Sequence, residues 1–529
     1  MLISPPFGGG RAPVLAKNVV ASSQPLATQA GIEALQNGGN AVDAALASAI
    51  TLTVVEPTMN GLGGDGFALI WDGKKLHGLN ASGRAPQAWS PEFFAGKTAM
   101  DLIGWNTVTV PGMVAGWIEL SRKFGKLPFA QLFKRAINYA ENGFPVSPVI
   151  ARQWREAIPV LRKQPGFLES FCVDGKSPAA GEIWRYPAQA NTLREIATTE
   201  GESFYSGALA KSMVEFSQAT GGCFTLADFA ANKPEWVEPL AFDYGEYTLH
   251  EIPPNGSGIA AQMALGILQA ANAKQYPANS AARIHLQVEA MRLAFADAYA
   301  HVSDKSSMTT PGSSLLNRDY LASRAALIDH QQAGTYAAGA PHSGGTVYLC
   351  AADDSGMMIS YIQSNFKGFG SGVVAPGGIA FHNRGMSFSL MNGHPNQVAP
   401  GKRPFHTIIP AFLSKGGKPA MAFGVMGGNM QPQGHIQVVM RFVDEYLNPQ
   451  ACSDAPRWRI DDAGKLTVEA SMPATVVEDL KTLGHDVTVM PANSLDFGSA
   501  QAIALLGEDT ASGYIAGSDH RRDGLAAGF

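Results

Sequence analysis

Gly344-Gly345-Thr346-Val347-Tyr348-Leu349 marks the point where this sequence changes from helical patterns to strand patterns. The apolar run begins abruptly at the threonine, after a long polar stretch rich in alanine and glycine. A threonine hydroxyl is a weak nucleophile unless a base lies beside it, and one such base is the α-amine of the same residue, freed by cutting the preceding bond. That amine has a pKa of about 8, so a useful fraction is unprotonated at neutral pH. The commoner reason for such a segment is a Gly-Gly turn entering a strand, so the case for chemistry depends on the rest of the chain.

The composition is that of a well-packed globular protein. The chain has 529 residues, 16% charged and 46% hydrophobic, with a formal net charge of −5. This length suggests roughly two to four domains, or one large intertwined domain. Because no basic surface is indicated, we expect no nucleic-acid partner.

Targeting and metal-binding signals are not evident in the sequence. The segment Met1 to Val20 has no continuous apolar stretch, so we expect neither a signal peptide nor a membrane anchor, and cytoplasmic residence is the default. The cysteines are far apart and form no Cys-x-x-Cys pair, and the histidines have no ligand spacing. We therefore expect no disulfide framework, no catalytic metal and no cofactor. The four cysteines are Cys172, Cys223, Cys350 and Cys452.

The N-terminal region predicts two helices followed by a glycine-rich loop. Pro25 to Gln36 and Ala41 to Val55 have helical patterns, separated by the cap signals Asn37-Gly38-Gly39 and Asn40. Next, Gly61-Leu62-Gly63-Gly64-Asp65-Gly66 matches the dinucleotide pattern G-x-G-x-x-G. That fingerprint needs a strand before it and a helix after it, whereas here a helix precedes and a strand-like segment follows. We interpret the loop as a crowded backbone segment beside a pocket and not as an NAD site.

The residues around Thr346 predict a mobile segment followed by a hairpin. Residues 337–345 have the composition of a mobile tail, in which a cut would cost little structure. Val347 to Ala352 and Met357 to Ser364 have strand patterns on either side of a turn at 353–356. Counting outward from the turn places Thr346 opposite Gln363 or Ser364.

A second hairpin pattern ends in two glycines. Its arms are Phe405 to Leu413 and Ala420 to Met426, followed by Gly427-Gly428 and a helical pattern from Gln433 to Tyr446. Backbone N–H groups near a helix N-terminus favour developing negative charge. The two glycine amides could therefore form an oxyanion hole.

The sequence resembles the γ-glutamyltransferases (glutathione hydrolases), a family of N-terminal-nucleophile enzymes, nearly end to end. Any one matching motif is weak, but six in the family's order are specific. They are Asn40 to Ala45; Val55-Glu56-Pro57 with Gly61 to Phe67; Val110-Pro111-Gly112 with Ala115-Gly116; Phe204 to Gly207; Phe497 to Gln501; and Asp519 to Gly524.

The resemblance implies a proenzyme that cleaves itself before its threonine. It implies an α+β fold with a four-layer αββα core, built from a large subunit of residues 1–345 and a small one of residues 346–529. Thr346 matches the nucleophile, and Ser364 matches a threonine that supports it. Gly427 and Gly428 match the oxyanion-hole glycines. The implied partners are a small-molecule amide and the two subunits of one chain, with a homo-oligomer of such heterodimers left open.

The positions that recognise substrate depart from the family pattern. The arginine that holds the glutamyl α-carboxylate is replaced by Ser82, with Arg84 two residues later. The remaining departures are Ser387 for the aspartate that binds the α-amine, Phe366 for an asparagine, His406 and Thr407 for paired serines, and Arg384 for a glutamine.

These departures argue against strict recognition of an amino-acid head. An unpaired substrate ammonium is costly in a dry pocket, so Ser387 is a poor replacement for aspartate. Arg84 and Arg384 could hold a carboxylate by bidentate hydrogen bonds, or could form structural ion pairs. The altered set resembles oxamate amidohydrolases and glutaryl-type cephalosporin acylases of the family. We therefore expect hydrolysis of, or acyl transfer from, a γ-glutamyl or similar carboxylate-bearing amide. One alternative is an oxamate or glutaryl amide hydrolase without γ-glutamyl activity. An alternative of another class is an unprocessed and catalytically silent binding protein.

Overall fold

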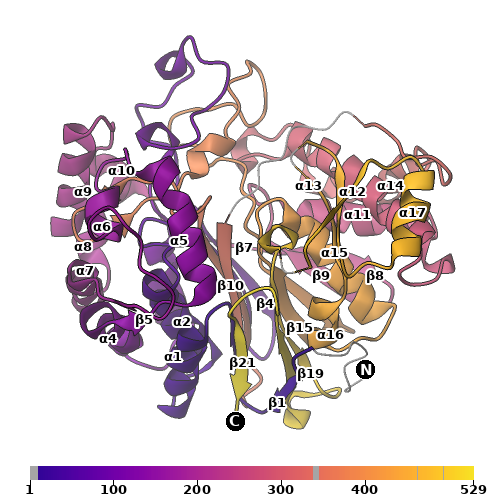
Figure 1. The fold of residues 1–529 in the computed structure, drawn as a ribbon, viewed down its shortest axis with the longest axis horizontal. Coiled ribbons are helices and arrows are strands. Elements are labelled where there is room, and N and C mark those ends of the chain that lie inside the picture. Colours follow the sequence, from indigo (N-terminus) through magenta and orange to yellow (C-terminus); the bar gives the residue numbers. More distant parts are fainter. Residues whose placement is uncertain (1–9, 337–344, 462, 493) are drawn as a thin grey trace.

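Two antiparallel seven-stranded sheets form the centre of the molecule (Figure 1). The computed structural model describes residues 10–336, 345–461, 463–492 and 494–529. In spatial order, the first sheet is β21 (Leu525–Gly528), β2 (Val19–Ser22), β10 (Gly345–Ala352), β11 (Met358–Phe366), β3 (Asp65–Trp71), β4 (Leu76–Ala81) and β7 (Glu235–Val237). The second sheet is β1 (Val14–Ala16), β20 (Tyr514–Ser518), β19 (Ala500–Leu505), β15 (Lys418–Val425), β14 (Ala411–Lys415), β9 (Tyr247–Glu251) and β8 (Leu240–Tyr244).

Helices lie on the two outer sides of the sheets, as Figure 1 shows. On the side of the first sheet are α1 (Pro25–Gln36), α2 (Ala41–Val55), α3 (Met113–Phe124), α4 (Lys134–Asn142), α5 (Pro148–Leu161), α6 (Phe167–Phe171), α7 (Pro187–Thr198), α8 (Glu202–Tyr205), α9 (Ala208–Ala219) and α10 (Leu226–Ala231). On the other side are α11 (Ile259–Ala270), α12 (Ala281–His301), α13 (Gly312–Leu315), α14 (Arg318–Ala325), α15 (Met430–Val443), α16 (Pro449–Asp454) and α17 (Ala474–Thr482).

Short elements complete the fold. The remaining strands are β5 (Phe144–Pro145), β6 (Ile183–Trp184), β12 (Val374–Ala375), β13 (Ile379–Ala380), β16 (Trp458–Ile460), β17 (Leu466–Glu469) and β18 (Val487–Met490). The 3₁₀ turns are η1 (Glu92–Phe94), η2 (Trp105–Thr107), η3 (Phe129–Phe133), η4 (Ala273–Gln275), η5 (Lys305–Ser307), η6 (Arg384–Ser387), η7 (Leu495–Phe497) and η8 (Thr510–Ser512). Within the described ranges, no helix is both long and apolar enough to cross a membrane.

The first two helices have the predicted bounds because their caps are explicit in the sequence. The Asn40 side chain accepts from the N–H groups of Val42 and Asp43, and Asp43 accepts in return from the Asn40 N–H. This reciprocal capping box fixes the start of α2. The order of elements around the glycine loop is also as predicted, with α2 before it and β3 after it.

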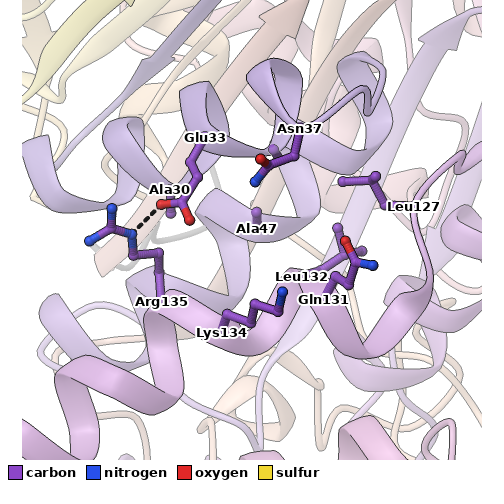
Figure 2. A pocket seen from close by; sticks show the side chains of 10 residues that line it. Ala30, Glu33, Asn37, Ala47, Leu127, Gln131, Leu132, Lys134 and Arg135 are labelled. Carbon is purple, nitrogen blue, oxygen red and sulfur yellow. Dashed lines mark hydrogen bonds and ion pairs between the residues drawn. The ribbon is translucent and has the colours of Figure 1, made fainter.

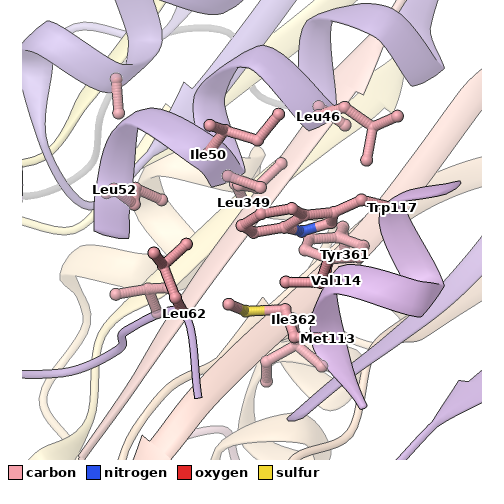
Figure 3. Close-up of a cluster of buried hydrophobic side chains, with 14 of the residues drawn as sticks. Leu46, Ile50, Leu52, Leu62, Met113, Val114, Trp117, Leu349, Tyr361 and Ile362 are labelled. Atoms are coloured by element: carbon pink, nitrogen blue, oxygen red, sulfur yellow. The ribbon is translucent and has the colours of Figure 1, made fainter. Parts of the chain in front are cut away.

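A buried apolar layer holds the hairpin of β10 and β11 in place (Figure 3). Leu46 and Ile50 of α2 and Trp117 of α3 pack against Leu349 and Ile362 of the hairpin. All fifteen residues of α2 are buried. The other face of the hairpin packs on β15 and β19 of the second sheet. The strand that contains the candidate nucleophile, β10, is therefore covered on both faces.

The second predicted hairpin is only partly a hairpin. β14 begins at Ala411, so the prediction of a strand from Phe405 was wrong over its first six residues. The backbone there bonds elsewhere: the His406 N–H donates to the Asn255 carbonyl, and the Ile409 N–H donates to the side chain of Gln431. Pro410 has no N–H to offer to a ladder. The helix predicted from Gln433 to Tyr446 is α15, shifted by three residues.

The predicted mobile tail lies almost wholly outside the described residues. Only Gly345, its last residue, is described, as the first residue of β10.

Candidate active site

Thr346 lies in an irregularity of the β10–β11 ladder. Gly345 pairs with Phe366 and Val347 pairs with Gln363, so the register shifts between them and Thr346 falls in the bulge. Thr346 is fully buried, and its hydroxyl donates a long hydrogen bond of 3.5 Å to Ser364 Oγ. Ser364 Oγ in turn accepts from the Phe366 N–H at 2.7 Å. The predicted nucleophile and its predicted supporting hydroxyl are thus adjacent, at a bulge of the kind often found beside active sites.

Gln431 is a contact of Thr346 that the sequence analysis missed. Its Nε2 donates to Thr346 Oγ1 at 3.2 Å, and the residue is fully buried. The only signal in the sequence was its place three residues after Gly428, because the predicted helix began two residues later, at Gln433.

Gly427 and Gly428 form the turn between β15 and α15. Their φ angles are +119° and +60°, values that favour glycine. Their carbonyls accept from the N–H groups of Met430 and Gln431. Since Gln431 reaches Thr346, the glycine pair lies one helical turn from a residue that contacts the candidate nucleophile, at the positive end of α15.

Arg384 is fully buried and only partly satisfied. Its Nη1 donates to Thr407 Oγ1 at 2.8 Å, and its guanidinium carbon lies 3.9 Å from the centre of the Phe366 ring. Among the described residues, neither Nε nor Nη2 has a hydrogen-bond partner. Burial lowers the pKa of Arg384 to about 9, with a nearby Asp65 opposing that shift. Because Phe366 pairs with Gly345, these free donors lie near the start of β10.

Asp65 is the carboxylate of this cluster, and protein donors engage both of its oxygens. Oδ1 accepts from the N–H groups of Gly83 and Gly112, at 2.9 and 3.1 Å. Oδ2 lies 3.1 Å from His406 Nε2. Burial raises the pKa of Asp65 to about 7, against the effect of Arg384. Hydrogen bonds to Asp65 thus connect the loop after β4 and the start of α3 with His406.

His406 and His382 both face Asp65 as neutral rings. Burial lowers the pKa of His382 to about 3 and places the pKa of His406 well below its usual range, with Arg384 adding to both shifts. His382 Nδ1 accepts from the Arg384 N–H at 3.0 Å, and His406 Nδ1 accepts from the Ile408 N–H at 3.4 Å. Each ring therefore carries its proton on Nε2, the nitrogen that faces Asp65.

Arg84 and Ser387 differ in their relation to Arg384. Ser387 ends the single turn η6 that Arg384 begins. Arg84 instead pairs with Glu235 at 2.6 Å and with Asp304 at 3.5 Å, on the wall of a cavity of about 950 Å³ between β7 and the segment 304–313. A substrate carboxylate would have to compete with both acidic residues for Arg84.

A small pocket between α1 and α4 is not a substrate site. Its volume is about 20 Å³, and an ion pair between Glu33 and Arg135 lies at its side (Figure 2). That volume is enough for about one water molecule.

One group of the described residues combines metal-ligand chemistry with proximity. Ligand atoms of His285, Glu289 and His485 lie within 4.8 Å of one another. His285 Nδ1 lies 2.8 Å from His485 Nε2, and Glu289 accepts from Arg292 and from the Gly334 N–H. These bonds engage the same atoms that a metal would need, so the group is a hydrogen-bonded cluster that ties α12 to the loop after α17.

Comparison with known proteins decides the family. The gamma-glutamyltranspeptidase family model matches residues 27–529. The chain belongs to this family. It is 36% identical to the glutathione hydrolase-like YwrD proenzyme of Bacillus subtilis, over 97% of this chain and 98% of that protein. It is also 36% identical to the oxamate amidohydrolase proenzyme of Klebsiella pneumoniae, over 95% and 97%.

One solved structure has nearly the same fold as this chain. The cephalosporin acylase from Bacillus halodurans superposes with a TM-score of 0.93 at 44% identity, over 100% of this chain and 99% of that one. Family membership and these relatives identify the chain as a glutathione hydrolase-like amide hydrolase.

Three of the six family motifs meet in a buried network. Arg522 pairs with Glu56 at 3.0 Å and donates to Ser499 Oγ at 2.9 Å. Beside it, Arg521 pairs with Asp519 and Glu469. These motif residues therefore join the start and the end of the chain.

Proposed function

We propose that the protein is a self-processing threonine amidohydrolase and acyltransferase whose substrates are amides with a carboxylate on the acyl part. Cleavage before Thr346 divides the chain into a large subunit of residues 1–345 and a small subunit of residues 346–529. The two sheets and their outer helices then form the four-layer αββα sandwich of N-terminal-nucleophile hydrolases. The observation that carries the proposal is the buried Thr346 hydroxyl at the start of β10, between Ser364 Oγ and Gln431 Nε2.

Processing and turnover use the same hydroxyl. In the precursor, Thr346 Oγ attacks the Gly345 carbonyl carbon, the C–N bond breaks, and the nitrogen takes the proton and becomes an α-amine. Water opens the resulting ester. In turnover the α-amine takes the hydroxyl proton while Oγ attacks the substrate carbonyl, and the Gly427 and Gly428 amides hold the oxyanion. The leaving amine takes that proton, and water or a second amine then releases the acyl group.

Arg384 is the group that selects the acyl part. Its two unpartnered, buried donors suit a carboxylate, and Thr407, which accepts from Nη1, keeps its own proton to donate. A substrate ammonium is less well served, since Ser387 replaces an aspartate and the oxygens of Asp65 are engaged. Glutaryl amides and oxamate therefore fit better than γ-glutamyl amides, which are the second candidate. The oxamate amidohydrolase and cephalosporin acylase among the relatives support this choice.

Gel analysis of the purified protein tests processing. We expect two bands of about 36 and 19 kDa, the shares of 345 and 184 residues in a chain of 55.8 kDa, with the smaller starting at Thr346. Thr346→Ala should stop both cleavage and turnover. Thr51→Ala is the matched control, because among the described residues this buried hydroxyl bonds only to the carbonyl of Ala47 in its own helix. A single intact band after long incubation would support the silent binding protein.

A matched pair of substrates tests the acyl specificity. Glutaryl anilide and γ-glutamyl anilide differ by one ammonium group, and oxamate tests a much shorter acyl part. We expect glutaryl anilide to have the higher kcat/KM of the pair. Reaction with the γ-glutamyl compound alone would refute the assignment of Ser387 and Arg384.

A further inference from the structure

The Gln431 amide is held in one orientation by the backbone. Its Oε1 accepts from the Ile409 N–H at 2.9 Å. The same side chain therefore directs Nε2, its donor, to Thr346 Oγ1 at 3.2 Å. Gln431 is fully buried and lies in the first turn of α15, three residues after Gly428. Both ends of the amide are engaged, so neither a flip nor a rotation is available without losing a buried hydrogen bond.

Thr346 Oγ has one proton and needs donors once that proton leaves. The hydroxyl donates a hydrogen bond to Ser364 Oγ and accepts one from Gln431 Nε2. When the α-amine removes the proton, Gln431 Nε2–H is already in position, with no reorganisation required. A donor placed in a buried site before charge develops is worth far more than the same donor in water.

We propose that Gln431 is a catalytic residue that stabilises negative charge on Thr346 Oγ. This inference rests on the proposed function, since it requires Thr346 to be the nucleophile. The hydrogen bond forms no covalent link and moves no proton: Gln431 keeps both amide hydrogens while Oγ attacks the carbonyl carbon and when Oγ leaves the ester during release of the acyl group. Gln431 acts first in processing, while Oγ attacks the Gly345 carbonyl, and then in turnover, while Oγ attacks the substrate carbonyl.

Gln431 also connects the nucleophile to the acyl-binding segment. Ile409 lies two residues after Thr407, which bonds Arg384. The amide thus holds Thr346 and the segment 406–409 at a fixed separation. Loss of the donor alone, with the acceptor kept, separates the two roles of this side chain.

Two substitutions remove the donor in different ways. Gln431→Glu keeps the length and the acceptor for the Ile409 N–H but replaces Nε2 by oxygen, whereas Gln431→Met keeps the length and removes both polar atoms. Gln433→Met is the matched control, because Gln433 is buried on the same helix and bonds Asn429, Ile460 and not Thr346. We expect both Gln431 variants to process about 100-fold more slowly than the control, the cost of losing one such donor.

The measurements separate chemistry from folding. Processing is followed on gels, kcat is normalised to the processed fraction, and the thermal midpoint is recorded for each variant. The rate at which an arylsulfonyl fluoride modifies Thr346, read by mass spectrometry, reports the reactivity of the hydroxyl independently of acyl binding. We expect this rate to fall with kcat while KM stays within about threefold. Should Gln431→Met fail to fold, Gln431→Glu carries the comparison, because it keeps the bond to Ile409.

The outcomes distinguish this inference from the proposed function. If the wild-type chain neither cleaves before Thr346 nor reacts there, the proposed function fails. If the wild type does both and the folded Gln431 variants match Gln433→Met in processing, kcat and modification rate, Gln431 has no catalytic role.

Discussion

Arg521 and Arg384 are both buried arginines, but they differ in how many of their hydrogen-bond donors have a protein partner. Arg521 bonds both oxygens of Glu469 through Nε and Nη2, bonds Asp519 through Nη1, and has its pKa raised by these partners. Arg384 bonds one hydroxyl, stacks on Phe366, and has its pKa lowered by burial. Burial alone therefore says little about what an arginine does.

The two arginines differ in which molecule supplies the negative charge that pairs with the guanidinium. The protein supplies it for Arg521, which is thus part of the fold. For Arg384 the described residues leave two donors open near the nucleophile, and a buried cation without enough partners is expensive. A substrate carboxylate would complete the site. Four predictions test this contrast.

Removing the Glu469 carboxylate from Arg521 should have the largest effect on stability. Glu469→Gln keeps the shape but removes the carboxylate that binds Arg521 through two nitrogens, so we expect the free energy of unfolding to fall by about 3–5 kcal/mol. Urea denaturation measures this loss. Glu478→Gln is the control, because that side chain is exposed and pairs with Lys481 at the surface, where about 0.5 kcal/mol is at stake. Equal effects of the two changes would remove the contrast.

Removing Arg384 should leave the fold stable and lower kcat/KM for the substrate. Arg384→Met should change the free energy of unfolding by less than about 1 kcal/mol, because it removes an undercompensated charge. It should lower kcat/KM for glutaryl anilide about 100-fold, the loss of charge-assisted hydrogen bonds worth about 3 kcal/mol. Steady-state kinetics and melting curves of one preparation give both numbers. A variant that unfolds would instead make Arg384 structural.

Binding of a carboxylate anion at Arg384 should stabilise the protein. Glutarate at about thirty times its Kd should raise the free energy of unfolding by about 2 kcal/mol, by mass action alone. Glutaramide, of the same length but uncharged, should have little effect, and Arg384→Met should abolish the gain. Stabilisation that survives in Arg384→Met would place the anion elsewhere, with Arg84 the first alternative.

The carboxylate beside Arg384 should give the smallest effect, seen as a pH dependence. The pKa of Asp65 is raised from 3.8 to about 7, so between these pH values the folded state holds a proton that the unfolded state has lost. Its contribution to stability is complete below about pH 4 and declines as pH rises to about 7. Relative to Asp65→Asn, the wild type should lose about 1 kcal/mol between pH 5 and 6. A flat difference between the two proteins would mean that Asp65 is ionised throughout.

The sequence was most informative where local chemistry acts. Asn37 and Asn40 predicted the end of α1 and the start of α2, and the strand patterns on either side of the turn at 353–356 predicted the hairpin that brings Ser364 to Thr346. It was least informative where tertiary contacts decide. Arg84 and Arg384 are alike in the sequence, and only the folded chain pairs Arg84 with Glu235, 151 residues away. Gln431 reaches Thr346 across 85 residues, and no spacing rule could reveal that bond.

The interleaving of strands has a consequence for what a cut at Thr346 can change. Segments before and after residue 345 alternate in the sheets, with β2 between β21 and β10, β3 beside β11, β1 beside β20 and β9 beside β14. Two fragments joined along five strand boundaries separate only when both unfold. A nicked molecule would therefore stay together while it is folded, and its fragments, once denatured and separated, would have to fold together again to restore either sheet.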